Sequence, residues 1–294
     1  MEDLQQKESG FENAERERLV EKIYQASLEQ HKKLAEVSTP LEIKSIIRDL
    51  LNEIDELYKV AGPEKAMSTL TPKIAEKIVA IWDFSGAGTY YEPSKDDAYK
   101  TARWADNADH DRLNYSAFLC RKIAELRTLG AILKGPIEEE DKRRSEAKML
   151  IAMDGPTIIY NGSHDENDAA IRIRNENDII PPERFDISGE DITKTADQIR
   201  DFKLPDNLHQ QGKEIAIVAH VEQFPRILRM LQHFKTLPAD MTIRLFPLAT
   251  PKNGREEYAL WEGRGLLYYI LLSKEHEAEK EPYPHIIHGT SQAK

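Results

Sequence analysis

Four short apolar runs, separated by longer stretches with helical periodicity, constrain the fold of this chain more than any other feature. The runs occupy residues 78–84, 157–160, 214–219 and 241–246. Apolar runs of this length that alternate with helices are typical of strands buried on both faces and connected by βαβ crossovers. The sequence therefore predicts the α/β class, with an open parallel sheet and helices on both faces.

The first part of the chain has a different pattern, with two helices and no strand. A charged helix is expected over residues 12–36. A second helix begins after Thr39, which with Glu42 forms a capping-box pattern, and apolar residues follow at helical spacing until residues 62–63, Gly-Pro, end it. These two segments predict an antiparallel helical pair.

Taken together, the patterns divide the chain into three parts. We expect a helical extension over residues 1–76, an α/β domain over residues 77–275 and a polar, frayed tail over residues 276–294. The helical pair could simply pack against the α/β domain. It could also hold a second copy of the chain or another protein through residues 12–61.

Composition excludes several classes of partner. The 294 residues carry a formal net charge of −11, whereas duplex DNA and anionic membranes attract proteins with a surplus of positive charge. The chain contains one cysteine, Cys120, which fits a reducing compartment. No uncharged run approaches the ~18 residues that span a bilayer, and the first residues lack a signal-peptide pattern. We expect a cytoplasmic protein without a membrane span.

Polar residues follow each apolar run, at the edge where open parallel sheets bind ligands. Residues 85–88, Ser-Gly-Ala-Gly, follow the first run, and Asn161-Gly162 follows the second. His220 follows the third, and Thr250 lies shortly after the fourth. The glycines could bring backbone amides close to an anion or could form a tight turn, and Asn161-Gly162 could also be a hairpin turn.

Charged residues near these positions are candidates for binding and proton transfer. Arg112 and Arg226 could hold a phosphate or carboxylate, although surface salt bridges are the alternative for both. His220 could be a general base or a core histidine. Glu166 lies in an acidic stretch, residues 163–168, that also fits the first turn of a helix. That stretch lacks the spacing of a calcium loop, so no metal site is predicted.

Conventional nucleotide motifs are incomplete. Tyr91 occupies the position of the third glycine in the dinucleotide fingerprint, and no lysine follows the glycines as in a P-loop. An ordinary NAD site and an ordinary P-loop are therefore not expected.

Several segments in combination resemble the ElyC/SanA/YdcF-like family over residues 77–272. The segments are Ser85-Gly86-Ala87-Gly88, Tyr160-Asn161-Gly162, Lys194-Thr195-Ala196-Asp197-Gln198 with Glu190 upstream, and Ala219 to Arg226. Asp197 and Gln198 differ from the usual family residues by one carbon each. The most important departure is Gln223, which stands where a histidine is common. An amide cannot carry a proton near neutral pH, and His220 is the nearest residue that could do so.

The resemblance implies a three-layer, Rossmann-like domain with a pocket for a nucleotide-like or S-adenosylmethionine-like ligand. The expected proton carriers are His220, Glu166 and Asp197. The expected ligand-binding residues are Ser85, Gly86, Gly88, Arg112, Asn161, Gly162, Glu190, Thr195, Gln198, Gln223 and Arg226.

Two hypotheses of function follow. In the first, the protein binds an anionic, nucleotide-like small molecule at the strand ends and catalyses transfer or hydrolysis on it. In the second, it is a non-catalytic interaction protein that binds through the helical pair. We favour the first, because glycine, threonine and arginine positions of the proposed pocket are retained together.

Overall fold

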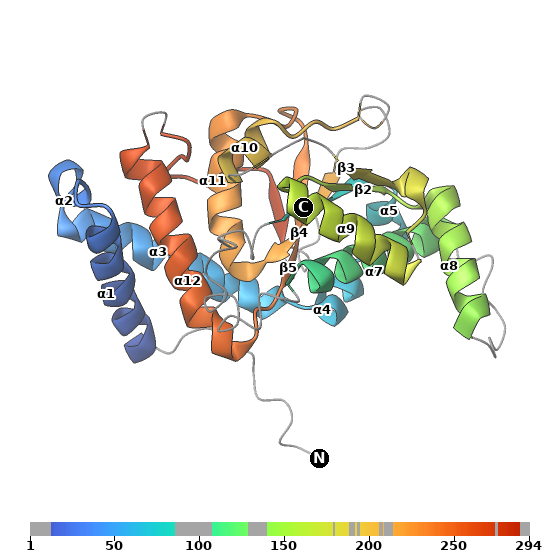
Figure 1. The fold of residues 1–294 in the computed structure, drawn as a ribbon, viewed down its shortest axis with the longest axis horizontal. Helices are drawn as coiled ribbons and strands as arrows, with labels where there is room; N and C mark the ends of the chain where they lie inside the picture. Colours follow the sequence, from blue (N-terminus) through green and yellow to red (C-terminus); the bar gives the residue numbers. More distant parts are fainter. Residues whose placement is uncertain are drawn as a thin grey trace, which may run out of the picture. The chain divides into compact units, whose positions relative to one another are not determined.

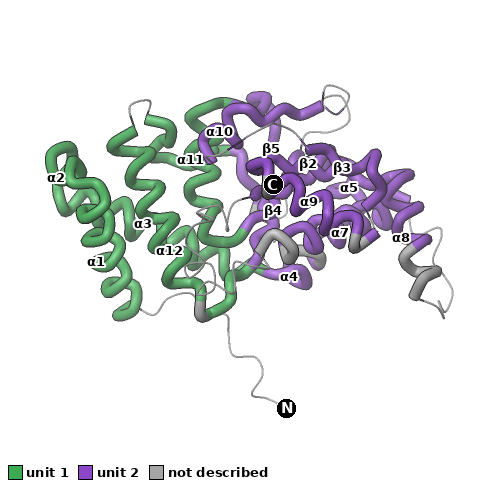
Figure 2. The backbone as a smooth tube through the Cα atoms, viewed as in Figure 1, with its two compact units in different colours: residues 1–61, 220–235, 249–284 green, residues 62–219, 236–248, 285–294 purple. Residues whose placement is uncertain are grey.

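The computed structural model confirms the predicted α/β class with an open parallel sheet (Figure 1). It describes residues 13–85, 108–128, 140–178, 180–187, 192, 195–205, 208, 214–273 and 276–288. Contacts within the chain define two compact units (Figure 2). Unit 1 comprises residues 1–61, 220–235 and 249–284, and unit 2 comprises residues 62–219, 236–248 and 285–294.

Unit 2 contains the sheet. Its six strands have the order β3-β2-β1-β4-β5-β6. The strand pairs with a described register, β1–β2, β1–β4, β2–β3 and β5–β6, are all parallel. The strands are β1 (Ile78–Asp83), β2 (Thr157–Tyr160), β3 (Phe185–Ile187), β4 (Glu214–His220), β5 (Thr242–Leu248) and β6 (Ile286–His288).

The strand order reverses beside β1. The chain passes from β1 outward to β2 and β3, and then returns to place β4 on the other side of β1. Every residue of β1 and β4 is buried, as expected for strands in the middle of a sheet. In open α/β sheets this reversal marks the edge where ligands bind.

Two short strands differ from the expected pattern. Strand β3 forms at Phe185–Ile187, outside the four apolar runs. Residues 286–288 of the expected tail form β6, which pairs with β5 through Ile243 and Ile286. Three-residue strands are too short to show periodicity, so pairing with a neighbour decides whether they form.

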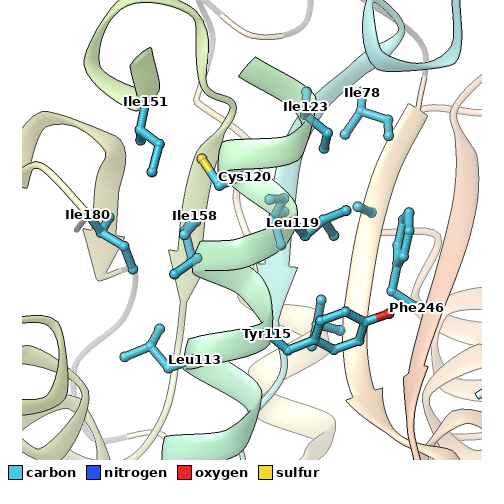
Figure 3. Close-up of a cluster of buried hydrophobic side chains, with 14 of the residues drawn as sticks. Ile78, Leu113, Tyr115, Leu119, Cys120, Ile123, Ile151, Ile158, Ile180 and Phe246 are labelled. Atoms are coloured by element: carbon cyan, nitrogen blue, oxygen red, sulfur yellow. The ribbon is translucent and has the colours of Figure 1, made fainter. Parts of the chain in front are cut away.

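The helices of unit 2 lie before and between the strands in the sequence. The long helix α7 packs against α8, α9, β1 and β2. Its apolar side chains, including Leu119 and Ile123, meet Ile78 and Ile158 of the sheet in a buried cluster (Figure 3). The helices are α4 (Pro63–Ser68), α5 (Pro72–Ala75), α7 (Ala108–Arg127), α8 (Glu140–Asp154), α9 (His164–Asn177), the short 3₁₀ turn η1 (Pro182–Arg184) and α10 (Thr195–Arg200).

Unit 1 is built from helices. The expected helix over residues 12–36 is α1 followed by a break and the short α2, and α1 packs against α3 and α12. Thr39 accepts a hydrogen bond from the Glu42 backbone, and Glu42 accepts one from the Thr39 backbone, which confirms the capping box. The elements are α1 (Asn13–Gln30), α2 (Leu34–Val37), α3 (Pro40–Val60), the 3₁₀ turn η3 (Val221–Gln223), α11 (Phe224–Phe234), α12 (Lys252–Leu267) and the π-helical turn η4 (Tyr268–Leu272).

A glycine permits the close packing of α12 on α1 and α3. A Cβ atom added to Gly263 would lie 2.9 Å from Ile23 Cγ2 and 3.2 Å from Leu50 Cδ2. The extension was expected to reach residue 76. Its residues up to 61 belong to unit 1, together with residues 220–235 and 249–284 from late in the chain. The domain boundary itself stays a prediction, because a division by contacts does not establish which segments fold independently.

Candidate functional site

A buried hydrogen-bond network joins the carboxyl ends of β1 and β2 to α10 in unit 2. Asn161, directly after β2, accepts a hydrogen bond from Trp82 Nε1 at 2.8 Å and donates one to the Gln198 carbonyl at 2.7 Å. The Gln198 side-chain amide donates to Ser85 Oγ and to the Asn161 carbonyl. Three of the predicted ligand-binding residues, from segments far apart in the sequence, are therefore held together as expected.

The turn between β2 and α9 brings Glu166 to the same network. The Glu166 Oε2 atom accepts a hydrogen bond from the Ser163 backbone at 2.7 Å and lies 3.5 Å from Ser85 Oγ. A Cβ atom at Gly162 would lie 2.8 Å from both Glu166 Cβ and Oε2, so a side chain at position 162 would displace the glutamate. Since β2 and β3 are parallel, Asn161-Gly162 is a strand-to-helix turn and not a hairpin.

The last residue of β1 is a fully buried carboxylic acid that the sequence analysis missed. Asp83 pairs in register with Tyr160 of β2 and Val218 of β4, so it lies beside the reversal of strand order. The Arg112 Nε atom is 4.0 Å from Asp83 Oδ1, and both side chains are fully buried. Burial raises the pKa of Asp83 to about 6, although Arg112 and the Ser116 hydroxyl lower it.

Glu166 has an oxygen atom that the network does not use. Burial raises the pKa of Glu166, although hydrogen bonds from Ser163 and the charge of Arg112 lower it. Its Oε1 atom is buried and accepts no hydrogen bond from the part of the chain that the structure describes. This carboxyl group can therefore accept a hydrogen bond from a ligand hydroxyl.

The predicted residues His220, Gln223 and Arg226 lie in unit 1. Gln223 Oε1 accepts a hydrogen bond from the His220 backbone at 3.1 Å, so this amide caps the turn η3. Arg226 donates two hydrogen bonds to Glu262, from Nε at 2.7 Å and from Nη2 at 2.9 Å. The sequence left two roles open for Arg226, an anion clamp or a surface salt bridge. Both side chains of the Arg226–Glu262 pair are buried, so the pair is not a surface salt bridge.

A second polar cluster surrounds Glu222 in unit 1. The fully buried Glu222 accepts hydrogen bonds from the hydroxyls of Tyr58 and Thr250. Burial raises the pKa of Glu222 to about 7, against the lowering effect of those two hydrogen bonds and of the Arg255 charge. His220 Nδ1 lies 3.4 Å from Thr250 Oγ1, so His220 belongs to this cluster.

The remaining predicted residues are not part of either hydrogen-bonded cluster or lie outside the described residues. Asp197 forms a surface ion pair with Arg200 at 2.6 Å, and Thr195 is half-buried at the start of α10. Gly86, Gly88 and Glu190 lie outside the described residues.

Two sequence signals could have revealed the missed residues. Asp83 is the only charged residue of an otherwise apolar run, and a charge at that place must be held by a partner or by a ligand. Glu222 lies two positions after β4, whose residues 215–219 are all apolar. In contrast, Tyr58 fits the apolar stripe of α3 and carries no sequence signal for its hydrogen bond.

The described segments contain neither a metal-binding cluster nor a membrane-spanning helix. These contain no group of three or more histidine, cysteine, aspartate or glutamate side chains placed to hold a metal ion. Within the same segments, no helix has the length and apolar character needed to cross a bilayer.

Comparison with known proteins gives no further identification. The chain matches no known protein family, no curated protein and no solved structure.

Proposed function

We propose that this protein binds a nucleotide-like or S-adenosylmethionine-like small molecule at the carboxyl ends of β1 and β2. One observation carries the proposal. The buried Asp83 and Arg112 and the partly buried Glu166 gather there, beside the reversal of strand order in an open parallel sheet. Ligands of such sheets bind at that edge.

The chemistry of these groups fits a ligand that carries both hydroxyl groups and an anion. Glu166 Oε1 would accept a hydrogen bond from a ribose-like hydroxyl, and Arg112 would offset negative charge. Ser85 and Asn161 hold the surrounding hydrogen-bond network in place. We also propose that the protein is cytoplasmic and is related to the ElyC/SanA/YdcF-like family. The family relationship is supported by the short segments that carry the resemblance.

A binding experiment tests this proposal. Thermal unfolding would be measured with AMP, ATP, S-adenosylmethionine and glucose 6-phosphate, each in large excess. A ligand present at a hundred times its dissociation constant stabilises the protein by about 2.7 kcal/mol. We expect AMP, ATP or S-adenosylmethionine to stabilise the protein. No stabilisation by any of these three, or stabilisation by glucose 6-phosphate alone, would refute the proposal.

The variants Glu166→Gln and Asp168→Asn locate the site. Both remove one negative charge from α9, but Asp168 is exposed and lies 3.7 Å from His164. We expect Glu166→Gln to weaken binding about tenfold, or about 1.4 kcal/mol, and Asp168→Asn to leave it unchanged. Equal effects of the two variants would place the ligand elsewhere.

Catalysis on the ligand is a further part of this proposal. Glu166 would carry the proton in a transfer or hydrolysis step, because burial raises its pKa and its Oε1 atom accepts no hydrogen bond from the described residues. Chromatography of the ligand after prolonged incubation tests this step. Full recovery of the unchanged ligand would mean that the protein binds without catalysis.

The alternative of an interaction protein is favoured by exposed apolar side chains on the helical pair. Val37 is 55% exposed and Leu41 is 76% exposed, and both lie near the junction of α2 and α3. Light scattering after size exclusion would measure the molecular mass of wild type and Leu41→Gln. A dimer mass lost in Leu41→Gln, but kept in a control Met153→Gln, would support this alternative, and a monomeric wild type would exclude self-association.

A further inference from the structure

Four side chains in unit 1 form a continuous buried chain of hydrogen-bonding groups. Tyr58 lies near the end of α3, His220 ends β4, Glu222 lies in η3, and Thr250 precedes α12. All four are buried, and Glu222 is completely so. This arrangement is separate from the strand-end network in unit 2, and the inference below does not depend on the ligand proposed there.

The proton positions in this chain follow from the donors available. Tyr58 donates its hydroxyl proton to Glu222 Oε1, and Thr250 donates its hydroxyl proton to Glu222 Oε2 at 2.6 Å. A hydroxyl group has one proton. With that proton committed to the carboxylate, Thr250 Oγ1 can only accept from His220 Nδ1, which lies 3.4 Å away. The neutral imidazole then carries its proton on Nδ1 and its lone pair on Nε2.

Neighbouring groups hold the two ends of the chain in place. The His220 ring meets the Tyr258 ring edge-on, with centroids 5.7 Å apart. Arg255 lies over the Tyr58 ring at 4.1 Å and donates from Nε to the Thr250 carbonyl at 3.0 Å. These contacts keep both aromatic residues and the threonine aligned with the carboxylate.

The helices that pack on η3 place charged and titratable groups near Glu222. Helix α3 contributes Tyr58, and α12 contributes the Arg255 cation, which lowers the pKa of Glu222. On α11, Arg226 is engaged by Glu262.

We propose that Tyr58, Glu222, Thr250 and His220 form a proton relay that makes His220 Nε2 a proton acceptor for a ligand hydroxyl or a water molecule. When Nε2 takes that proton, the Nδ1 proton moves to Thr250 Oγ1, and the Thr250 proton moves to Glu222 Oε2. One N–H bond forms at Nε2, one breaks at Nδ1, and one O–H bond forms on Glu222. The imidazole ends neutral, the donor of the proton becomes an anion, and the charge of Glu222 is neutralised.

The energetics of the carboxyl group fit this role. Burial raises the pKa of Glu222 to about 7, so its ionised and protonated forms are close in free energy at neutral pH. Glu222 can therefore both fix the tautomer of His220 and receive the relayed proton. Glu222 and Thr250 are positioning residues in this scheme, since they act through His220.

Nitrogen NMR of the full-length protein labelled with ¹⁵N-histidine tests the relay without any ligand. The signals of His220 are identified by their loss in His220→Gln. At pH 8 we expect wild-type His220 to carry its proton on Nδ1. Lowering the pH through 7 should move that proton position towards Nε2, because protonated Glu222 can donate to Thr250 and allow Thr250 to donate to Nδ1.

Three variants separate the relay from simple packing. Thr250→Val keeps the side-chain shape and should shift the His220 proton from Nδ1 to Nε2 at pH 8, whereas Thr250→Ser should keep it on Nδ1. Thr236→Val is the matched control, since the Thr236 hydroxyl donates to the Ile199 carbonyl at 2.9 Å outside the relay. It should leave His220 unchanged. A wild-type proton on Nε2 at pH 8, or an unchanged tautomer in Thr250→Val, would overturn the proposal.

Discussion

Breaking the buried pair of Arg226 and Glu262 is expected to destabilise the protein far more than removing the whole pair. The guanidinium donates two hydrogen bonds to the carboxylate, at 2.7 and 2.9 Å, and the side chains are only 9% and 4% exposed. Burial raises the pKa of Glu262 even though Arg226 lowers it, so desolvation exceeds the attraction between the charges. The pair therefore contributes little net stability as a unit, but each charge depends on its partner.

The expected magnitudes follow from this balance. Glu262→Gln leaves a buried cation without its counter-charge, and the cost is about 3–5 kcal/mol. That is a large share of a typical unfolding free energy of about 5–15 kcal/mol. The double variant Arg226→Met with Glu262→Leu should lie within about 1.5 kcal/mol of wild type, because neither charge then remains buried.

Arg226→Met should show a dependence on pH that Glu262→Gln lacks. Without the cation, the pKa of Glu262 in the folded protein rises further above its value in the unfolded chain. The folded state then binds protons more readily, so stability falls as pH rises through the folded pKa and recovers as pH falls. The cost of Arg226→Met is therefore expected to be smaller at pH 5 than at pH 8.

Urea unfolding, followed by both circular dichroism and tryptophan fluorescence, measures these differences. The comparison is valid where the two transitions coincide and the slope with urea is unchanged. Arg200→Met provides the control, because Arg200 forms an exposed pair with Asp197 that is worth about 0–1 kcal/mol. A cost below about 1 kcal/mol for Glu262→Gln would refute the reasoning, since a surface pair behaves in that way.

Three other predictions concern single side chains. Asp83 has a folded pKa of about 6 and an ordinary value of 3.8. We therefore expect this group to add about 2 kcal/mol to the unfolding free energy of wild type as pH falls from 7 to 4, and we expect Asp83→Asn to lose that gain in urea unfolding. Gly263→Ala should destabilise the protein by about 1–3 kcal/mol, because the new Cβ would lie 2.9 Å from Ile23 Cγ2. In contrast, Gly265→Ala, two positions along α12 with its nearest neighbour at 3.9 Å, should stabilise it by about 0.5–1 kcal/mol; equal thermal shifts of the two variants would contradict this. Burial raises the pKa of Cys120 to about 12, so a thiol reagent should label it only at the rate of unfolding, and fast labelling in native buffer would argue against its burial.

Periodicity predicted the long elements of this fold and failed for the short ones. The four apolar runs correspond to β1, β2, β4 and β5, because strands buried on both faces are mostly apolar. The edge strands β3 and β6 have three residues each, and Phe185–Ile187 is only partly buried. Such strands depend on hydrogen bonds to a neighbour that is distant in the sequence, which local patterns do not contain.

The candidate site was predicted in part for a related reason. Ser85 and Asn161 follow two predicted strands, and the prediction that they lie together is confirmed. It succeeded because parallel strands end at one edge of the sheet. The partner of Arg226 was not predictable, since Glu262 lies on a later helix and no spacing rule joins them. Sequence position therefore indicates where polar groups meet, while burial decides whether a charge faces a ligand or another side chain.

The central position of β4 has a consequence for how the chain is made. Strand β1 pairs with β4 from Ile78 and Glu214 onward, so a nascent chain that has just produced β1 must extend by about 130 residues before the partner exists. At about 5–20 residues per second, this wait lasts roughly 7–26 seconds on the ribosome. During that time, one edge of the most apolar strand lacks its native partner and can pair with other chains. The protein is therefore expected to need protection by chaperones during synthesis, and its soluble yield should fall when translation is slowed between residues 83 and 214.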